Sequence, residues 1–101
     1  MKPHISEYIE FFGYSTADFI SCEICSGKAV DIHHIHRRGK GGDPALDRIE
    51  NLMALCRVCH IKYGDKVQFK ALLYKIHLKA LELANKEFDR AWITAQLEKY
   101  S

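Results

Sequence analysis

The residues best suited to chemistry are cysteines and histidines that gather in the middle of the chain. Four cysteines form two Cys-x-x-Cys pairs, Cys22 with Cys25 and Cys56 with Cys59, and the sequence contains no other cysteine. Each pair can place two thiolates on one metal ion, and two pairs supply the four ligands of a tetrahedral zinc site. We therefore predict that these cysteines together hold one structural Zn²⁺.

Two disulfides are the alternative use of the same cysteines. The N-terminal residues 1–6 lack the apolar segment of a signal peptide, which indicates a reducing compartment in which disulfides are rare. The sequence also has no apolar run long enough to span a membrane. We therefore expect zinc-bound thiolates in a cytoplasmic protein that has no membrane partner.

The histidines lie in a defined order relative to the cysteine pairs. His33 and His34 are adjacent and stand between the pairs, and His60 directly follows the second pair. The full pattern is Asp31-Ile-His33-His34-Ile, then Gly41-Gly42, then Asn51-Leu52, and finally Cys56-x-x-Cys59-His60. This pattern resembles the HNH endonucleases of the ββα-metal type over about two fifths of the chain, with the three letters on His34, Asn51 and His60.

The resemblance implies metal-dependent hydrolysis of DNA phosphodiester bonds that leaves 5′ phosphate and 3′ hydroxyl ends. It implies that His34 is the general base and that His33 and His60 hold a catalytic divalent ion. An imidazole titrates near neutral pH and so suits the base, while a cation stabilises the negative charge that grows on the leaving oxygen. Members of the family often carry Asp where this chain has His33, so Mg²⁺, Mn²⁺, Ni²⁺ and Zn²⁺ all stay open as the catalytic metal.

The middle letter of the motif, Asn51, is predicted to act through backbone contacts. Its amide both donates and accepts, so we expect it to hold the loop that carries His34 and not to bind the metal. For the adjacent histidines an alternative stays open, because neighbouring residues of a strand point to opposite faces and one of them could be a surface residue. We expect His4 and His77 on the surface, and His36 to be either solvated or in contact with substrate.

A glycine-rich loop follows the histidines and carries the basic residues Arg37, Arg38 and Lys40. Bare amides and basic side chains can approach phosphates there, so we predict that these residues contact double-stranded DNA. A solvated loop without a nucleic-acid role is the alternative. The formal net charge of +2 does not by itself indicate a nucleic-acid partner, so the prediction depends on the local cluster.

These side chains must be positioned by a small mixed fold. The 101 residues are predicted to form one domain of α+β class, a ββα-metal finger over residues 22–64 with N- and C-terminal helices on either side. β-branched residues favour strands, and apolar residues at three- and four-residue spacing favour helices. The predicted elements are helices at about 3–13, 65–86 and 87–100, a connector at 14–21, strands at 29–36 and 52–55, and a short helix that carries His60.

The two C-terminal helices are predicted to be amphipathic. In the first of them the expected buried face consists of Phe69, Leu72, Leu73, Ile76, Ala80, Leu83 and Ala84. These helices could brace the finger, clamp a duplex or form a dimer, so the oligomeric state stays open.

Small HNH endonucleases of this kind are common in phages and bacteria, so the resemblance implies a phage or bacterial source. Two other functions stay open. One is a non-catalytic zinc-finger module that binds DNA, in which the histidines only support the fold. The other is a helical adaptor for protein interactions. The presence of both His34 and His60 favours the nuclease over these two alternatives.

Overall fold

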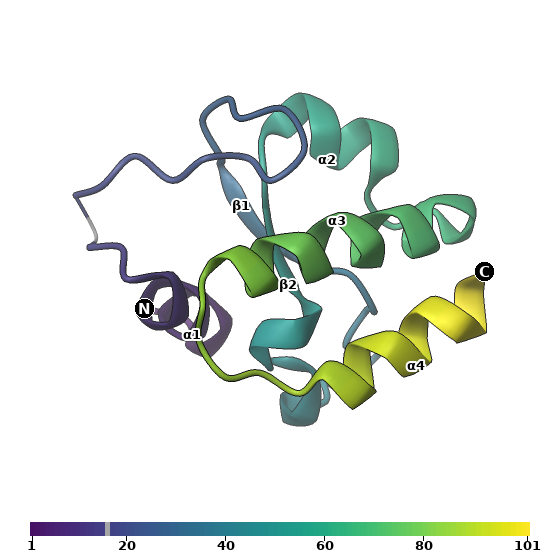
Figure 1. Cartoon of the computed structure of the whole chain (residues 1–101). Helices are drawn as coiled ribbons and strands as arrows, with labels where there is room; N and C mark the ends of the chain where they lie inside the picture. The colour runs from purple at the N-terminus through teal and green to yellow at the C-terminus, as the bar shows by residue number, and fades with distance from the viewer. Residues whose placement is uncertain (16) are drawn as a thin grey trace.

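The computed structural model describes residues 1–15 and 17–101, and Thr16 in the predicted connector lies outside the described residues. The class is mixed α+β, as predicted, with a two-stranded hairpin, a short helix after it, and helices from both ends of the chain (Figure 1). The helices and strands are α1 (Pro3–Phe12), β1 (Asp31–His34), β2 (Leu52–Leu55), α2 (Arg57–Tyr63), α3 (Lys70–Leu83) and α4 (Arg90–Tyr100). Short 3₁₀ turns lie at Pro44–Leu46, Ile49–Asn51 and Val67–Phe69.

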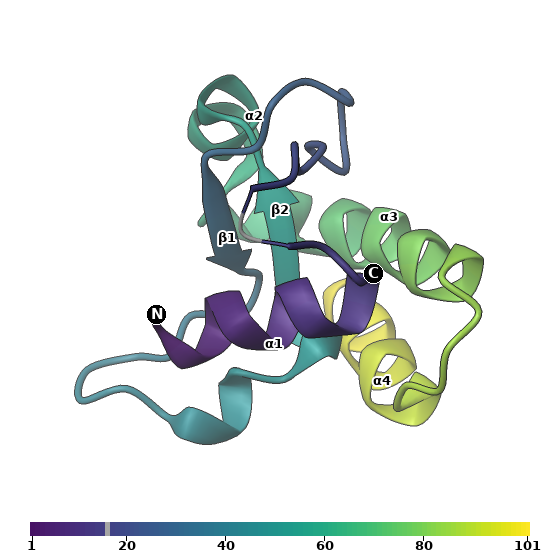
Figure 2. The same ribbon diagram turned by 90° about the vertical axis from the view of Figure 1, so that its left-hand side faces the viewer.

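The hairpin is the part of the fold that positions the histidines. β1 and β2 run antiparallel, with His34 opposite Leu52. Figure 2 shows α2 at one end of the hairpin and α1 crossing its strands, while α3 and α4 lie together to one side. All of β2 is buried, in agreement with its unbroken apolar sequence. β1 is less deeply buried than β2: Asp31, Ile32 and His34 are partly exposed, and His33 is buried.

The first strand is shorter than the predicted range 29–36, whereas the second agrees with its prediction. Backbone hydrogen bonds from Val30 N–H to Leu55 O and from Ile35 N–H to Asn51 O still continue the pairing just beyond both ends of β1. The chain then turns into the basic loop, which ends the ladder.

The short helix α2 begins in the second cysteine pair, as predicted, whereas the two C-terminal helices begin later than predicted. α2 ends before Gly64, and Asp65 has a φ of +58°, which no helix can accommodate. The chain passes through a 3₁₀ turn and becomes α-helical again at Lys70, so the predicted helix from residue 65 is interrupted at its start. The last helix begins at Arg90, where the Asp89 carboxylate accepts from Trp92 N–H at 3.0 Å and caps it.

The buried face of α3 also differs from the prediction. Leu72 and Leu83 are 42% and 80% exposed, and the buried residues of the helix are Leu73, Tyr74, His77 and Leu81. Both sets follow helical spacing. The observed face includes a tyrosine and a histidine with hydrogen-bond partners, and a pattern of apolar residues alone does not select them.

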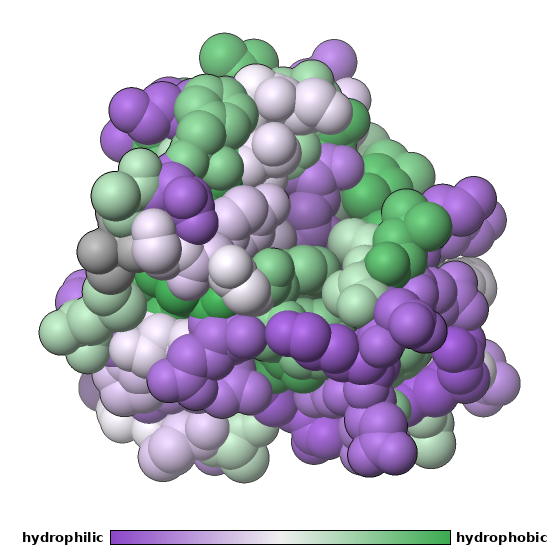
Figure 3. Space-filling view, turned by 60° about the vertical axis from the view of Figure 1, so that its left-hand side comes forward, coloured by the Kyte–Doolittle hydropathy of each residue, from purple (hydrophilic) through white to green (hydrophobic). Residues whose placement is uncertain are grey.

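Exposed apolar side chains are scattered over the surface. They include Phe19, Val58 and Ile61. Figure 3 shows one face of the molecule, on which hydrophobic and hydrophilic side chains are interspersed. Within the described part of the chain, no helix combines the length and the apolar character needed to cross a bilayer.

His77 is completely buried, which corrects the prediction of a surface position. Its Nδ1 lies 2.8 Å from Glu23 Oε1 and its Nε2 lies 2.6 Å from Ile49 O. An ionised carboxylate and a carbonyl only accept, so both contacts are hydrogen bonds when both ring nitrogens carry protons. Burial by itself would lower the pKa of His77, but the Glu23 carboxylate and these hydrogen bonds outweigh it and raise the pKa. Because Tyr8 O–H also donates to Glu23, at 2.6 Å, this glutamate joins α1 to α3.

We expect His77→Ala to lower the free energy of unfolding by about 3–5 kcal/mol at about pH 6, because it leaves the Glu23 charge buried and unpaired. The pKa of His77 is raised in the folded state. Its stabilising charge is therefore fully present below the unfolded-state pKa of about 6.5 and is lost as pH rises through the folded-state pKa. The deficit of the variant should accordingly shrink at high pH.

Urea denaturation of zinc-loaded wild type and variant, at acidic and alkaline pH, measures this deficit. His36→Ala is the matched control, because His36 is only half-buried and has no contact with Glu23. A deficit that stays constant or grows with pH would show that His77 is not charged in the folded protein.

Candidate active site and metal centres

The two cysteine pairs meet in one cluster. All four cysteines are free thiols, and their sulfur atoms all lie within 4.8 Å of one another. Cys25 Sγ and Cys56 Sγ are 3.6 Å apart. A disulfide would need about 2.05 Å, whereas two sulfurs bound to one tetrahedral zinc ion lie about 3.8 Å apart. The cluster therefore fits a zinc ion and is not a pair of disulfides.

Backbone contacts hold each pair in place. In the first pair, Cys22 N–H donates to Gly27 O at 2.7 Å, and Glu23 N–H donates to Ala54 O of β2 at 3.0 Å. In the second pair, Cys56 caps α2, and the hydrogen bond from Cys59 N–H to its sulfur lowers the pKa of the Cys56 thiol to about 7. The second strand thus connects the two pairs, and one thiol is readily ionised for metal binding.

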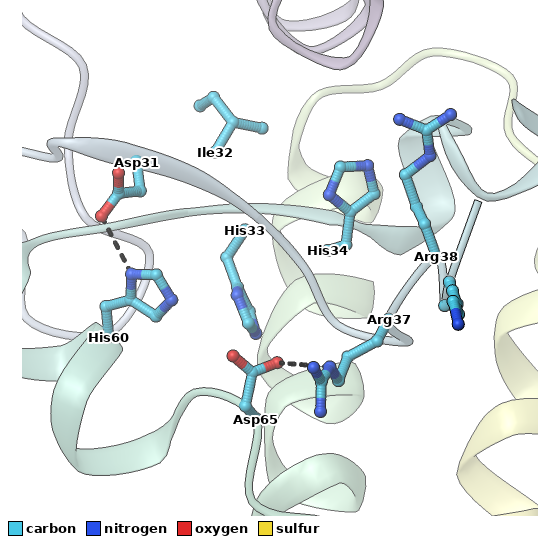
Figure 4. A pocket seen from close by; sticks show the side chains of 10 residues that line it. Asp31, Ile32, His33, His34, Arg37, Arg38, His60 and Asp65 are labelled. Atoms are coloured by element: carbon cyan, nitrogen blue, oxygen red, sulfur yellow. Dashed lines mark hydrogen bonds and ion pairs between the residues drawn. The ribbon is translucent and has the colours of Figure 1, made fainter. Parts of the chain in front are cut away.

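A second cluster consists of His33, His60 and Asp65, whose donor atoms also lie within 4.8 Å of one another. His33 comes from β1, His60 from α2 and Asp65 from the turn after α2, as Figure 4 shows. Among the described residues, Nε2 of His33 has no hydrogen-bond partner although it is buried. Burial, followed by the nearby His60 ring, lowers the pKa of His33 to about 4, so its ring is neutral at neutral pH. A buried free nitrogen beside two further donors suits a metal ion.

The ring of His60 is held in one orientation by its neighbours. Asp31 Oδ2 lies 2.9 Å from His60 Nδ1, which places a proton on Nδ1 and leaves Nε2 free to bind a metal. A Cβ at Gly64 would lie 2.5 Å from His60 Cδ2, so the ring can lie against this turn only because residue 64 is glycine. The next residue, Asp65, adopts a left-handed φ that costs a non-glycine residue about 1–3 kcal/mol.

His34 leaves β1 on the opposite side from His33 (Figure 4). Its Nε2 lies 2.7 Å from Asp47 Oδ1. The other ring nitrogen, Nδ1, does not take part in this contact. On the same side, His4 of α1 packs against it with ring centroids 4.7 Å apart. His4 is therefore half-buried, which corrects its predicted surface position, and burial together with His34 lowers its pKa.

One cleft of about 600 Å³ brings these groups together. It is lined by His33 and His34 and also by all three predicted basic residues, Arg37, Arg38 and Lys40. Within the described residues, β1 pairs with β2 alone, so its other edge is open. Side chains from both faces of β1 can therefore reach the same cleft, although the two histidines point in opposite directions.

Asn51 is fully buried and lies beside the loop that follows His34. Its Oδ1 accepts from His36 N–H and from Tyr74 O–H, both at 2.8 Å. Its Nδ2 donates to His36 O and to Leu46 O, both at 3.0 Å. These bonds use both amide donors and both acceptor positions, so no lone pair is left for a metal. The side chain of His36 itself is half-buried, with Nδ1 3.3 Å from Tyr100 Oη.

Three carboxylates that touch the histidines were not assigned from the sequence: Asp31, Asp47 and Asp65. For Asp31 a signal exists, because it precedes His33 by two positions and so shares its face of the strand. Asp65 lies one helical turn or so beyond His60, which is a weaker signal because Gly64 breaks the helix. Asp47 lies in the long loop between the strands, and no spacing rule connects it to His34.

Residues 22–66 match the family model for HNH endonuclease. No match to the chain was found among curated proteins or among solved structures. The matched range contains both cysteine pairs, the hairpin, α2 and the whole His33–His60–Asp65 cluster. With the four-cysteine cluster beside a hairpin and helix, residues 22–66 of this chain are an HNH endonuclease domain.

Proposed function

We propose that this protein is a metal-dependent endonuclease that hydrolyses phosphodiester bonds of double-stranded DNA and leaves 5′ phosphate and 3′ hydroxyl ends. The main support is the partnerless Nε2 of His33, beside His60 and Asp65 in the cleft that also contains His34. A buried polar atom without a partner is costly, and a metal ion would supply the missing partner.

The residues suited to hold the catalytic ion are His33 and His60, with Asp65 as a third ligand. Two imidazoles and one carboxylate suit Mn²⁺, Ni²⁺ or Zn²⁺ better than Mg²⁺, which prefers oxygen ligands. When bound, the ion would stabilise the negative charge that develops on the scissile phosphate and the leaving oxygen. We also infer that the four cysteines hold a structural Zn²⁺ that is separate from this ion.

His34 is the proposed general base. A neutral imidazole has one N–H and one lone pair, and donation from Nε2 to Asp47 leaves the lone pair on Nδ1. Nδ1 can then take a proton from the attacking water, and the Asp47 carboxylate stabilises the imidazolium that forms. Asn51 acts as a positioning residue, because it fixes the backbone of His36 just after the base.

Arg37, Arg38 and Lys40 are the proposed phosphate contacts. In the structure, Arg37 Nε lies 3.9 Å from Asp65 Oδ1, and Arg38 Nε lies 3.5 Å from Asp47 Oδ1. Partly exposed ion pairs of this kind contribute little stability, so phosphates can replace these carboxylates at small cost. The same contacts orient the arginines toward the two proposed catalytic groups.

Incubation of the zinc-loaded protein with supercoiled plasmid and Mg²⁺, Mn²⁺ or Ni²⁺ tests the proposal. We expect nicked or linear DNA with at least one of these metals and none with chelator. The ends should accept ligase without prior phosphorylation, as 5′ phosphates do. A folded, zinc-loaded preparation that binds DNA but leaves it uncut with every metal would instead indicate a non-catalytic DNA-binding module.

Alanine variants of Arg37, Arg38 and Lys40 should each weaken DNA binding by a similar factor on unrelated sequences. Each lost phosphate contact should reduce the slope of log affinity against log salt concentration by about one unit. Fluorescence anisotropy over a series of salt concentrations measures both quantities. Lys79→Ala is the control, because Lys79 is exposed on α3 and does not line the cleft. Unchanged slopes for all three cleft variants would show that the loop is solvated and does not contact DNA phosphates.

A further inference from the structure

We propose that His4, His34 and Asp47 form a second site for a transition-metal ion, and that Zn²⁺ bound there inhibits cleavage by occupying the general base. The ligand atoms of these residues all lie within 4.8 Å of one another. None of the three belongs to the His33–His60–Asp65 cluster. The inhibition rests on the proposed role of His34 as base, whereas the metal binding does not.

The atoms of this second site need to move little to hold an ion. Two ligands of one tetrahedral zinc ion lie about 3.4 Å apart, since each bond is about 2.0–2.2 Å long. His34 Nε2 and Asp47 Oδ1 are 2.7 Å apart and would need to separate slightly. The rings of His4 and His34 are 4.7 Å apart and tilted by 46°, not stacked. Both rings can therefore direct a nitrogen toward a shared point beside the carboxylate.

Three separate parts of the chain build the site. His4 lies in the first turn of α1, His34 ends β1, and Asp47 follows the 3₁₀ turn Pro44–Leu46. The side chains of His34 and Asp47 are 18% and 11% exposed, so they are screened from bulk water but can still be reached. This placement favours binding over an equivalent group of residues on an open surface, because less solvent competes for the donors.

The donor set determines which ions the site accepts. Two imidazole nitrogens and one carboxylate oxygen favour Zn²⁺, Co²⁺ and Ni²⁺ over Mg²⁺, which prefers oxygen ligands and gives up its waters reluctantly. Three protein ligands leave one position of a tetrahedral zinc ion for water. Mg²⁺ should therefore bind this site weakly, whereas added Zn²⁺ should occupy it. Because the His33–His60–Asp65 site has the same donor types, a zinc effect is assigned to the second site by comparison with His4→Ala.

Occupation of the site removes the base for a simple chemical reason. Metal binding forms bonds to one nitrogen of each histidine and to one Asp47 oxygen. It breaks the His34–Asp47 hydrogen bond and competes with Arg38 for the Asp47 carboxylate. If Nε2 of His34 binds the ion, the single proton of the neutral ring lies on Nδ1. No lone pair of the ring is then left to deprotonate water.

Metal binding can be measured without any cleavage. In a His60→Ala background, which removes a ligand of the other site, Co²⁺ is titrated into zinc-loaded protein and followed by its visible d–d absorption and by calorimetry. We expect one Co²⁺ equivalent to bind, and we expect addition of His4→Ala to weaken this binding at least tenfold. His36→Ala is the matched control and should bind Co²⁺ as the background does. Asp47→Ala provides a second test should circular dichroism show that His4→Ala is not folded.

Inhibition is then measured on plasmid in excess Mg²⁺. His4→Ala should cut at the wild-type rate without added zinc, and it should need at least tenfold more Zn²⁺ for half inhibition. Equal Co²⁺ affinity in the His4→Ala and background proteins, or equal zinc sensitivity of wild type and His4→Ala, would overturn the proposal. If Co²⁺ binds as expected but no preparation cuts DNA, the proposed nuclease function fails and the metal site stands.

Discussion

His34→Ala should cut DNA about 10²–10⁴-fold more slowly than wild type, the usual contribution of a general base. The substitution removes no cysteine and no member of the His33–His60–Asp65 cluster. The variant should therefore keep its fold, its structural zinc, its affinity for DNA and the metal proposed to take part in catalysis. Single-turnover cleavage of plasmid, metal analysis and anisotropy on the same preparation measure these properties together.

His60→Ala provides the comparison that separates the base from the metal. Removal of this ligand should abolish both cleavage and binding of the catalytic ion, while the four-cysteine cluster keeps its zinc. His36→Ala serves as the control for loss of a nearby imidazole, because His36 is held mainly through its backbone by Asn51. It should cut within a few-fold of wild type.

His34→Ala should lose cleavage but keep the catalytic ion, whereas His60→Ala should lose both. A non-catalytic module cannot show this difference. A zinc finger or an adaptor would show the same plasmid background for wild type and both variants. If His34→Ala nicks plasmid at the wild-type rate, in a preparation from nuclease-deficient cells, His34 is not the base and the mechanism proposed above is wrong.

The sequence was sufficient where the arrangement of side chains depends on short spacings. Each Cys-x-x-Cys pair fixes two thiols locally, and the short apolar run of Leu52 to Leu55 favours a buried strand beside them. The alternation of a strand likewise places His33 and His34 on opposite sides. These features follow from the chain within a few residues of each site, and the structure contains all of them.

Features that depend on contacts between distant segments were missed for a physical reason. Whether a histidine is buried depends on which carboxylate lies across from it, and His77 meets Glu23 from 54 positions away. The pairing of His34 with Asp47 likewise depends on the path of a loop, which no periodicity describes. The error on α3 has the same origin, because Tyr74 packs against the rings of Trp92 and Tyr100 and donates to Asn51, and the sequence of α3 alone does not reveal these contacts.

Removal of metal should occur in two steps with different consequences. The His33–His60–Asp65 site keeps open positions and has weaker donors than four thiolates, so a brief, mild chelator treatment should empty it first. Cleavage should then disappear while the circular dichroism spectrum and the zinc content stay unchanged. Addition of Mn²⁺ or Ni²⁺, which suit this donor set, should restore cutting.

A stronger chelator that removes the cysteine-bound zinc should unfold the protein. Structural zinc contributes about 10–16 kcal/mol of apparent free energy in small zinc domains near neutral pH, which is as large as the whole stability of about 5–15 kcal/mol typical of a folded protein. The first cysteine pair also holds Glu23, whose side chain contacts Tyr8 of α1 and His77 of α3. Release of that pair should therefore loosen both helices as well as the finger.

Cleavage, zinc content and circular dichroism followed against chelator dose on one preparation measure both steps. His60→Ala is the matched control: it should lack the first step and unfold at the same dose as wild type. Cys22→Ala should have little structure at any chelator dose, as if the structural zinc had already been removed. Three thiolates hold zinc less tightly than four, and the substitution also removes a buried side chain from the core. The two sites are independent only if activity and fold are lost at different doses. Loss of both at one dose would mean that a single metal centre supports the fold and the chemistry together.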